Sequence, residues 1–273
     1  QALGFGGSPG EFNGVAGPDF AAYFTSRGSV MGQVAPDVVA AAFGVFDPAV
    51  VLPSVAHGWS LTDAPTICAA RDRGAIAHLT RMLGPDPDGL DRAIELLDRA
   101  VAPLRREGRS LFSGLSSLAV PDEPIGRMWR RADQLREYRG DSHLAAWIAA
   151  GLDAPEICVL SDPYYGLPLY SYSRSRGWPK DTLVAAGDRL RARGLATEDG
   201  LTDEGRELRE AIERATDAQV APSIAALGDD VEELIGILRP WGAAIRAARG
   251  YPPSGPHDLA GTDAARGRSD GER

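Results

Sequence analysis

The chain contains 273 residues, of which 44% are hydrophobic and 25% are charged, a balance typical of a globular protein with room for two cores. Its formal net charge of −9 argues against a surface that binds nucleic acid on all sides, although one local basic face remains compatible with it. The two cysteines lie outside any metal-binding motif, and there is neither a secretion signal nor an apolar run of about 18 residues that could span a membrane. We therefore expect a cytoplasmic protein with no membrane partner, no metal and no cofactor.

The first part of the chain predicts a loop followed by a helical domain. Residues 1–17 are rich in glycine and predict a flexible N-terminal loop; the first residue is Gln1 rather than Met, which is compatible with a fragment of a longer protein. Residues 18–125 predict a helical, degenerate winged-helix-like domain that ends in a link rich in Ser, Gly and Pro at 113–124. Its helices are expected near 19–26, 36–46, 49–59, 65–83 and 89–108.

The second part, residues 126–250, predicts another helical domain, and residues 251–273 predict a disordered tail because they contain almost no large apolar side chain. We expect Asp141 or Ser142 to cap the second helix of this domain and Thr202 to cap the fifth. Its helices are expected near 125–140, 141–153, 154–162, 179–195, 203–219 and 229–248.

The two parts repeat several features in the same order. Arg27-Gly28 and Arg139-Gly140 each precede a small-residue helix, and a Gly-Trp pair and an Arg-x-Arg pair follow in each part. The offsets between matching features drift, so the sequence supports either a degenerate tandem repeat or two unrelated helical bundles of similar composition.

Residues 183–217 carry the most specific pattern in the chain. A helix ends at Arg193-Gly194-Leu195, a short polar hairpin follows, and Leu201-Thr202 precedes another long helix. Gly194 permits a left-handed helix stop, and a two-stranded wing can form across Asp199-Gly200. This pattern closely resembles the winged-helix domain of the multiple-antibiotic-resistance regulator (MarR) family. Residues 190–195 match the end of its recognition helix and first wing strand, and residues 201–206 match the second strand and the following cap.

The resemblance to MarR-like proteins covers residues 128–248. A longer stretch, from about residue 20 to residue 246, is similar to an actinobacterial group of mostly uncharacterised tandem winged-helix proteins. Together these resemblances imply a mainly α protein of two helical halves, the C-terminal one a winged helix-turn-helix with a short β-wing.

The resemblance also implies where double-stranded DNA would bind. In family members that bind DNA, the recognition helix enters the major groove and the wing reaches the minor groove. Here the wing that follows this helix carries the acidic residues Glu198 and Asp199 at its tip. A basic tip would favour binding to phosphates. The matching basic residues of the helix, which we expect to contact DNA, are Lys180, Arg189, Arg191 and Arg193.

A second candidate site is the dense charged segment at residues 136–143. It is compatible with a salt-bridged helix end, with an anion-binding pocket between the halves, or with a catalytic site in which His143 acts as general base. In the pocket interpretation, the ligand-binding residues are Arg27, Arg139, His143, Tyr164 and Tyr165. In the catalytic interpretation, Asp141 or Glu137 orients His143 and Tyr138 supplies a proton.

The sequence therefore predicts a ligand-responsive, DNA-binding transcriptional regulator, either a monomer or a homodimer, whose ligand is small and hydrophobic or anionic. The alternative is a winged-helix scaffold that sequesters a small molecule or acts as a cofactor-free enzyme. Because no nucleophile, phosphate-binding or metalloprotease motif accompanies the charged segment, a regulator is favoured over an enzyme.

Overall fold

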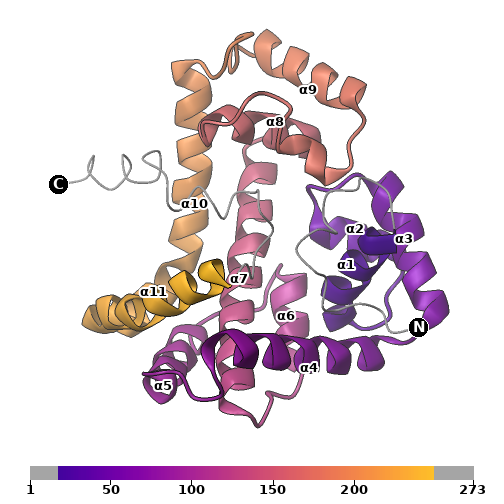
Figure 1. Cartoon of the computed structure of the whole chain (residues 1–273). Helices are drawn as coiled ribbons and strands as arrows, with labels where there is room; N and C mark the ends of the chain where they lie inside the picture. The colour runs from indigo at the N-terminus through magenta and orange to yellow at the C-terminus, as the bar shows by residue number, and fades with distance from the viewer. Residues whose placement is uncertain (1–17, 249–273) are drawn as a thin grey trace.

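Two long helices, α7 (Pro124–Ala149) and α10 (Asp203–Leu227), pack side by side and form the axis of the molecule (Figure 1). The computed structural model describes residues 18–248. The expected N-terminal loop at 1–17 and the expected tail at 251–273 lie outside the described residues. Within residues 18–248 the secondary structure is helical, apart from one isolated antiparallel bridge between Ala196 and Leu201.

The other helices surround this axis in three groups (Figure 1). On one side lie α1 (Pro18–Gly28), α2 (Pro36–Phe43) and α3 (Pro48–Leu61). At the lower end of the view are α4 (Ala64–Leu83), α5 (Leu90–Val101), α6 (Ser110–Ser117) and α11 (Val231–Ala247). At the upper end are α8 (Ala154–Tyr164) and α9 (Lys180–Ala192). Short 3₁₀ turns occur at Ser29–Met31, Ser173–Arg176 and Gly228–Asp230.

Helix caps begin and end several elements as their residue types require. Asp63 accepts a hydrogen bond from the Thr66 amide and so starts α4, and the Thr202 hydroxyl accepts one from the Gly205 amide and starts α10. Gly194 ends the segment after α9 with a φ of 73°, the left-handed conformation that favours glycine. The predictions for Thr202 and Gly194 are confirmed.

The apolar cores cross the expected boundary at residue 125. One cluster combines Leu90 and Leu96 of α5 with Leu227 of α10 and Trp241 of α11. A second joins Trp147 of α7 to α8, α9 and α10, and a third contains the aromatic residues of α1 and α2. The division of the chain into two halves therefore stays a prediction, because residues from both are buried in the same core.

The structure corrects the prediction of a break at residue 140. Helix α7 continues through Gly140, where a glycine costs only about 1 kcal/mol, and the helix is packed along its length by α5, α6 and α10. Asp141 is therefore inside the helix. Instead of capping its own segment, it accepts a hydrogen bond from the Phe112 amide in the first turn of α6.

Four other expectations near the helix ends are also corrected. The expected β-wing is reduced to the single Ala196–Leu201 bridge in a hairpin closed by a Thr197 N–H to Gly200 carbonyl hydrogen bond of 2.8 Å. The expected link at 113–124 begins inside α6, whose Leu111 and Leu115 are buried against Val30. Helix α5 ends at Val101, shortly before Pro103, and α10 continues to Leu227 with Pro222 inside it.

Candidate functional site

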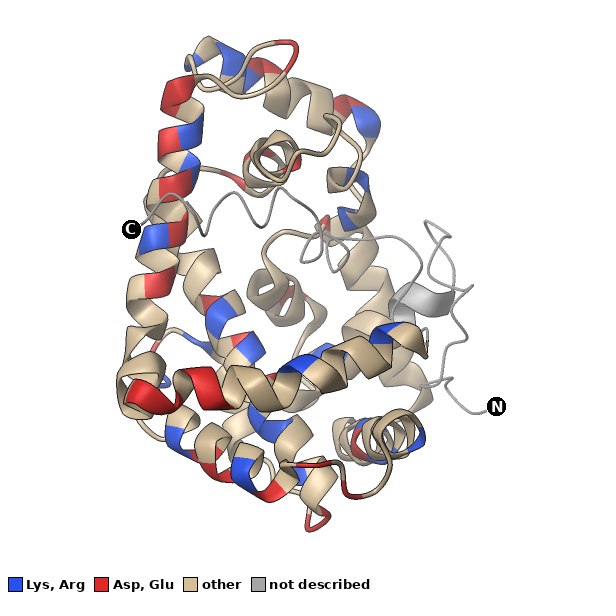
Figure 2. Ribbon diagram, turned by 60° about the vertical axis from the view of Figure 1, so that its left-hand side comes forward, with Lys and Arg blue, Asp and Glu red and all other residues tan. Residues whose placement is uncertain are grey.

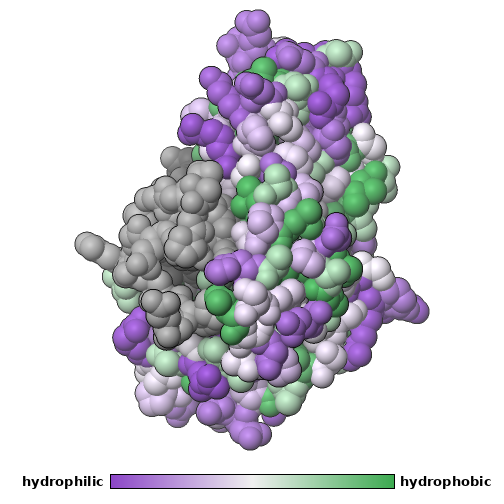
Figure 3. All heavy atoms as spheres, turned by 90° about the vertical axis from the view of Figure 1, so that its right-hand side faces the viewer, coloured by the Kyte–Doolittle hydropathy of each residue, from purple (hydrophilic) through white to green (hydrophobic). Residues whose placement is uncertain are grey.

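Helix α9 lies at one end of the molecule with one face buried and the other open. Leu183, Ala186 and Leu190 are buried against α8 and α10. Helix α8 is started by Asp153, which forms a reciprocal capping box with Glu156. Hydrophilic residues gather over this end of the molecule (Figure 3). The open face of α9 is therefore presented to solvent by a rigid helical support.

Three arginines, which we call the α9 arginines, are ion-paired to neighbouring carboxylates: Arg189 and Arg191 on α9, and Arg193 directly after its last residue. Arg189 places Nη2 2.5 Å from Asp153 Oδ2 and Nε 3.0 Å from Glu156 Oε1. Arg193 Nη1 lies 3.4 Å from Glu156 Oε2. Arg191 pairs with Asp188 on its own helix. The carboxylates of α8 thus act as intramolecular counterions for the basic residues of α9.

The charge balance of this end is negative. Residues 153–156 and 180–202 carry four basic residues and six acidic ones. The acidic residues include Glu198 and Asp199, which are exposed on the hairpin. Because carboxylates repel phosphates, the net charge of this surface opposes DNA binding.

The connection between α8 and α9 is longer than that of a compact helix-turn-helix, in which about three or four residues join the helices. Residues 165–179 link α8 to α9 and are held by buried Asp162, which accepts hydrogen bonds from the Ser173 amide at 3.1 Å and hydroxyl at 2.8 Å. The same loop docks on the N-terminal helices, since Trp178 Nε1 donates to the Val45 carbonyl at 2.8 Å.

A tighter helix-turn-helix occurs between α2 and α3. Residues 44–47 connect these helices, and Gly44 adopts a φ of 59°. However, α3 contains no lysine, arginine, aspartate or glutamate. Because phosphate binding requires basic side chains, α9 is better suited than α3 to contact phosphates.

A chain of alternating charges joins α1, α7 and α4; we call it the α7 ion-pair chain. Glu137 is 2% exposed and accepts two hydrogen bonds from Arg27, from Nε at 3.0 Å and from Nη2 at 2.8 Å. Arg136 bridges Glu137 to Asp133, and Asp133 also pairs with Arg71 at 2.5 Å. Burial opposes ionisation of Glu137, but the adjacent Arg27 outweighs it, so the pKa of Glu137 lies below its usual value.

Asp141 lies one turn beyond Glu137 in a different environment. Burial raises the pKa of Asp141 to about 6, and the nearby Glu137 charge adds to this effect, while the Phe112 amide partly offsets it. A carboxyl whose pKa is raised on folding stabilises the protein fully below its unfolded pKa, and this contribution is lost as the pH rises through its folded pKa.

We therefore expect Asp141→Asn to become relatively more stable than the native protein between pH 4 and pH 7. The amide oxygen of Asn can still accept from the Phe112 amide, whereas the native carboxylate must ionise in a buried site. The shift to about 6 corresponds to a gain on the order of 2 kcal/mol at pH 7 relative to pH 4. Urea unfolding at both pH values measures it, with the exposed Asp199→Asn as control. An unfolding difference that is equal at both pH values would contradict the prediction.

His143 belongs to a second polar cluster, the Arg209 cluster, which comprises Arg209, Glu213, Arg139, His143, Thr216, Tyr164 and Tyr165. Burial and, after it, the positive charge of Arg209 together lower the pKa of His143 to about 4, so the ring is neutral at pH 7. Its Nδ1 lies 3.1 Å from Thr216 Oγ1, and the Thr216 hydroxyl donates to the Ile212 carbonyl. Nδ1 must therefore carry the proton, which leaves Nε2 as the acceptor.

The centre of this cluster is Arg209, which is almost fully buried. It pairs with Glu213 at 2.6 Å, donates to the Tyr165 hydroxyl at 3.1 Å and lies 4.5 Å from the centre of the Tyr164 ring. Arg139 pairs with Glu213 from the solvent side. The cluster joins α7, α8 and α10 where these helices meet.

The structure separates the predicted catalytic residues. Glu137 faces Arg27, Asp141 faces α6, and His143 bonds to Thr216, so neither carboxylate orients the imidazole. Tyr138 is buried with its ring edge against Phe112, at 4.9 Å between ring centres. Positions 137, 138, 141 and 143 share a helix but point to different neighbours. Among residues 18–248, no group of three or more Cys, His, Asp or Glu side chains could hold a metal ion.

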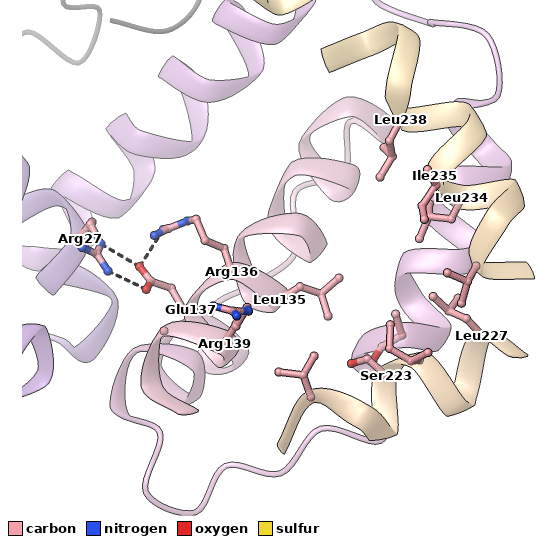
Figure 4. Close-up of a pocket in the computed structure, with 15 residues that line it drawn as sticks. Arg27, Leu135, Arg136, Glu137, Arg139, Ser223, Leu227, Leu234, Ile235 and Leu238 are labelled. Atoms are coloured by element: carbon pink, nitrogen blue, oxygen red, sulfur yellow. Dashed lines mark hydrogen bonds and ion pairs between the residues drawn. The ribbon is translucent and has the colours of Figure 1, made fainter. Parts of the chain in front are cut away.

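An open apolar groove lies between α7 on one side and α10 and α11 on the other (Figure 4). Its volume is about 640 Å³, which falls within the range of small-molecule sites. Arg27 and Arg139 line it, whereas His143, Tyr164 and Tyr165 do not. The five predicted ligand-binding residues are thus divided between this groove and the Arg209 cluster.

Comparison with protein families gives one match. A model described as a helix-turn-helix family covers residues 10–252, which is most of the chain. The chain belongs to this helix-turn-helix family. The searches of curated proteins and of solved structures found no match.

Several residues of this helix-turn-helix protein were not singled out by sequence reasoning. Arg209, Glu213 and Thr216 lie on α10 at helical spacing, and an Arg–Glu pair four residues apart is usually a solvent-exposed pair. In the sequence, the apolar residues of the groove could not be distinguished from ordinary core positions.

In residues 18–248 no single helix is both long and apolar enough to cross a membrane. Helices α7 and α8 together reach that length and composition, but the chain bends by 106° between them.

Proposed function

We propose that this helix-turn-helix protein is a cytoplasmic, ligand-responsive transcriptional regulator that binds double-stranded DNA through α9. The observation that carries the proposal is the position of α9: it is exposed at one end of the molecule, is followed by a hairpin and α10, and bears Lys180 and the α9 arginines. Membership of a helix-turn-helix family is consistent with DNA binding.

In this proposal the ion pairs of the α9 arginines must open or be shared when DNA binds. Asp188 and Asp153 are well exposed, so their pairs with Arg191 and Arg189 are screened by water and exchange easily. DNA phosphates then compete with these carboxylates for the guanidinium groups. We expect modest affinity that falls steeply with salt.

The double variant Arg191→Ala/Arg193→Ala should lower DNA affinity by about tenfold or more and reduce the slope of log K against log salt by about two, because two phosphate contacts are lost. Fluorescence anisotropy with fragments from the promoter region of the protein's own gene measures both. The matched control is Arg105→Ala, another exposed and ion-paired arginine located far from α9.

Removing an acidic competitor should have the opposite effect. Asp188→Asn frees Arg191 from its carboxylate partner and should tighten DNA binding about two- to fivefold without affecting the fold. If the protein shifts none of the fragments at low salt, or if Asp188→Asn and the double arginine variant bind as the native protein does, α9 is not a DNA-contacting helix.

A second candidate is a small-molecule-binding protein that acts without DNA. The apolar groove favours it, since the groove is formed away from α9 and includes two of the predicted ligand-binding arginines. Ligand binding combined with the absence of any DNA binding at low salt would favour this candidate over the regulator.

A further inference from the structure

The two walls of the apolar groove differ in chemical character (Figure 4). The wall formed by α10 and α11 is mainly aliphatic, whereas the opposite wall, formed by α7 and by Arg27 of α1, carries the charged side chains. Along α11, the acidic residues are confined to the first turn, and an uncharged stretch follows them (Figure 2). The aliphatic lining consists of Ala100, Leu135, Val220, Ile224, Leu227, Val231, Leu234, Ile235 and Leu238. A molecule that satisfies both walls must be amphipathic.

The aliphatic wall is also partly open. Ile224 is 54% exposed and Ile235 is 41% exposed, so apolar surface at the mouth is left in contact with water. None of the described lining residues is aromatic. Planar ligands gain much of their affinity from stacking on aromatic rings, whereas a flexible hydrocarbon chain gains from each buried methylene group. The lining therefore fits an aliphatic chain better than an aromatic ring.

The charged wall is predominantly positive. Arg27, Arg136 and Arg139 line it together with a single carboxylate, Glu137. Glu137 is already bound by Arg27 and Arg136, and it is nearly fully buried. The outward arginines are Arg136, 50% exposed, and Arg139, 46% exposed. Arg136 uses Nε and Nη2 for Asp133 and Glu137, which leaves Nη1 for a ligand. The ion pairs of Arg139 with Glu213 and Asp217 use Nη2, so its other N–H groups remain available to a ligand.

We propose that the groove binds a single-chain amphipathic anion, a medium-chain alkyl carboxylate, with its chain along α10 and α11 and its carboxylate at Arg139 and Arg136. This anion would be the ligand of the regulator proposed above. Only its effect on DNA binding rests on that proposed function, because the groove can bind a ligand in the absence of DNA. A second copy docked symmetrically on the groove would instead bring like-charged arginines toward each other.

Calorimetry and thermal unfolding with decanoate test the proposal. Decanoate should bind and raise the melting temperature, while decan-1-ol, decyltrimethylammonium and benzoate should bind at least about tenfold more weakly, because each lacks either the anion or the chain. From octanoate to dodecanoate, each added methylene should lower Kd about three- to fourfold. Equal binding of decanoate and decan-1-ol, or tighter binding of benzoate, would overturn the proposal.

Two pairs of variants locate the site. Ile224→Glu should weaken decanoate binding at least about tenfold, whereas Ile148→Glu, at a residue 55% exposed on a different surface, should not. Arg139→Gln should weaken binding of decanoate but not of decan-1-ol, and Arg127→Gln, which also loses an exposed ion-paired arginine, serves as control.

If Ile224→Glu changes the oligomeric state measured by light scattering and leaves decanoate binding unchanged, the groove is a contact between copies and the proposal fails. Because these measurements contain no DNA, their failure is distinct from failure of DNA binding.

Discussion

Glu137→Ala should be among the most destabilising single substitutions in this protein, with a loss of about 3–5 kcal/mol in the free energy of unfolding. The native carboxylate is buried and accepts three charged hydrogen bonds, two from Arg27 and one from Arg136. Removing it leaves the Arg27 guanidinium with the Tyr23 hydroxyl and the face of Phe43, neither of which carries a compensating charge. Urea unfolding at pH 7 measures the loss.

Two further variants distinguish loss of the pair from loss of volume. Arg27→Met combined with Glu137→Leu replaces both charges with apolar groups and should recover much of the stability, because the unpaired charge is removed. Glu107→Ala removes an exposed carboxylate that pairs with Arg105 and should change stability little. If Glu137→Ala is no more destabilising than Glu107→Ala, the Arg27–Glu137 pair does not hold α1 against α7.

The stability that Glu137 contributes should also depend on pH. Its pKa is lowered on folding, so its contribution is present above the unfolded pKa and is lost as the pH falls through the folded pKa. The difference between the native protein and Glu137→Ala should therefore shrink in strong acid. This direction is opposite to that of Asp141, although the two carboxylates lie one helical turn apart, because only Glu137 is paired with arginine.

Gly205→Ala should be the second strongly destabilising substitution, at a cost of about 3 kcal/mol or more. A Cβ at this position would lie 1.8 Å from the Leu195 carbonyl oxygen, and a backbone atom cannot rotate away as a flexible side chain can. Either the hairpin or the first turn of α10 must move, which also disturbs the Thr202 cap. Thermal unfolding measures the loss.

Gly236→Ala supplies the matched control for this substitution. Gly236 lies inside α11, and a Cβ there would contact no atom within 4 Å. Since alanine favours a helix over glycine by about 1 kcal/mol, this variant should be neutral or more stable than the native protein. A Gly205→Ala variant as stable as Gly236→Ala would show that the hairpin does not pack closely on α10.

Local signals predicted helix starts and stops well and helix continuity poorly. Thr202 and Gly194 act as expected because a cap is decided by the residue and its immediate neighbours. The expected break at Gly140 does not occur, because packing on several sides of α7 outweighs the small helix penalty of one glycine. Helix α6 was missed because Ser and Gly alternate with its apolar residues.

The candidate sites divide in a similar way. The pattern at 183–217 identified α9 and its basic residues, and the family match agrees with a helix-turn-helix protein. The pattern could not reveal that α8 supplies carboxylates to the α9 arginines, because Asp153 and Glu156 are about 35 positions away along the chain. The charged segment at 136–143 looked like one site, but a helix turns successive side chains to different neighbours.

The sequence by itself determined that the protein is mainly helical and where most helices begin, because these properties depend on periodicity and on neighbouring residues. Only the tertiary structure decided which charges are paired, that the β-wing is reduced to a single bridge, and that α7, α10 and α11 enclose an apolar groove. These features depend on side chains brought together from helices that are distant in sequence, so they could not be predicted from composition or spacing.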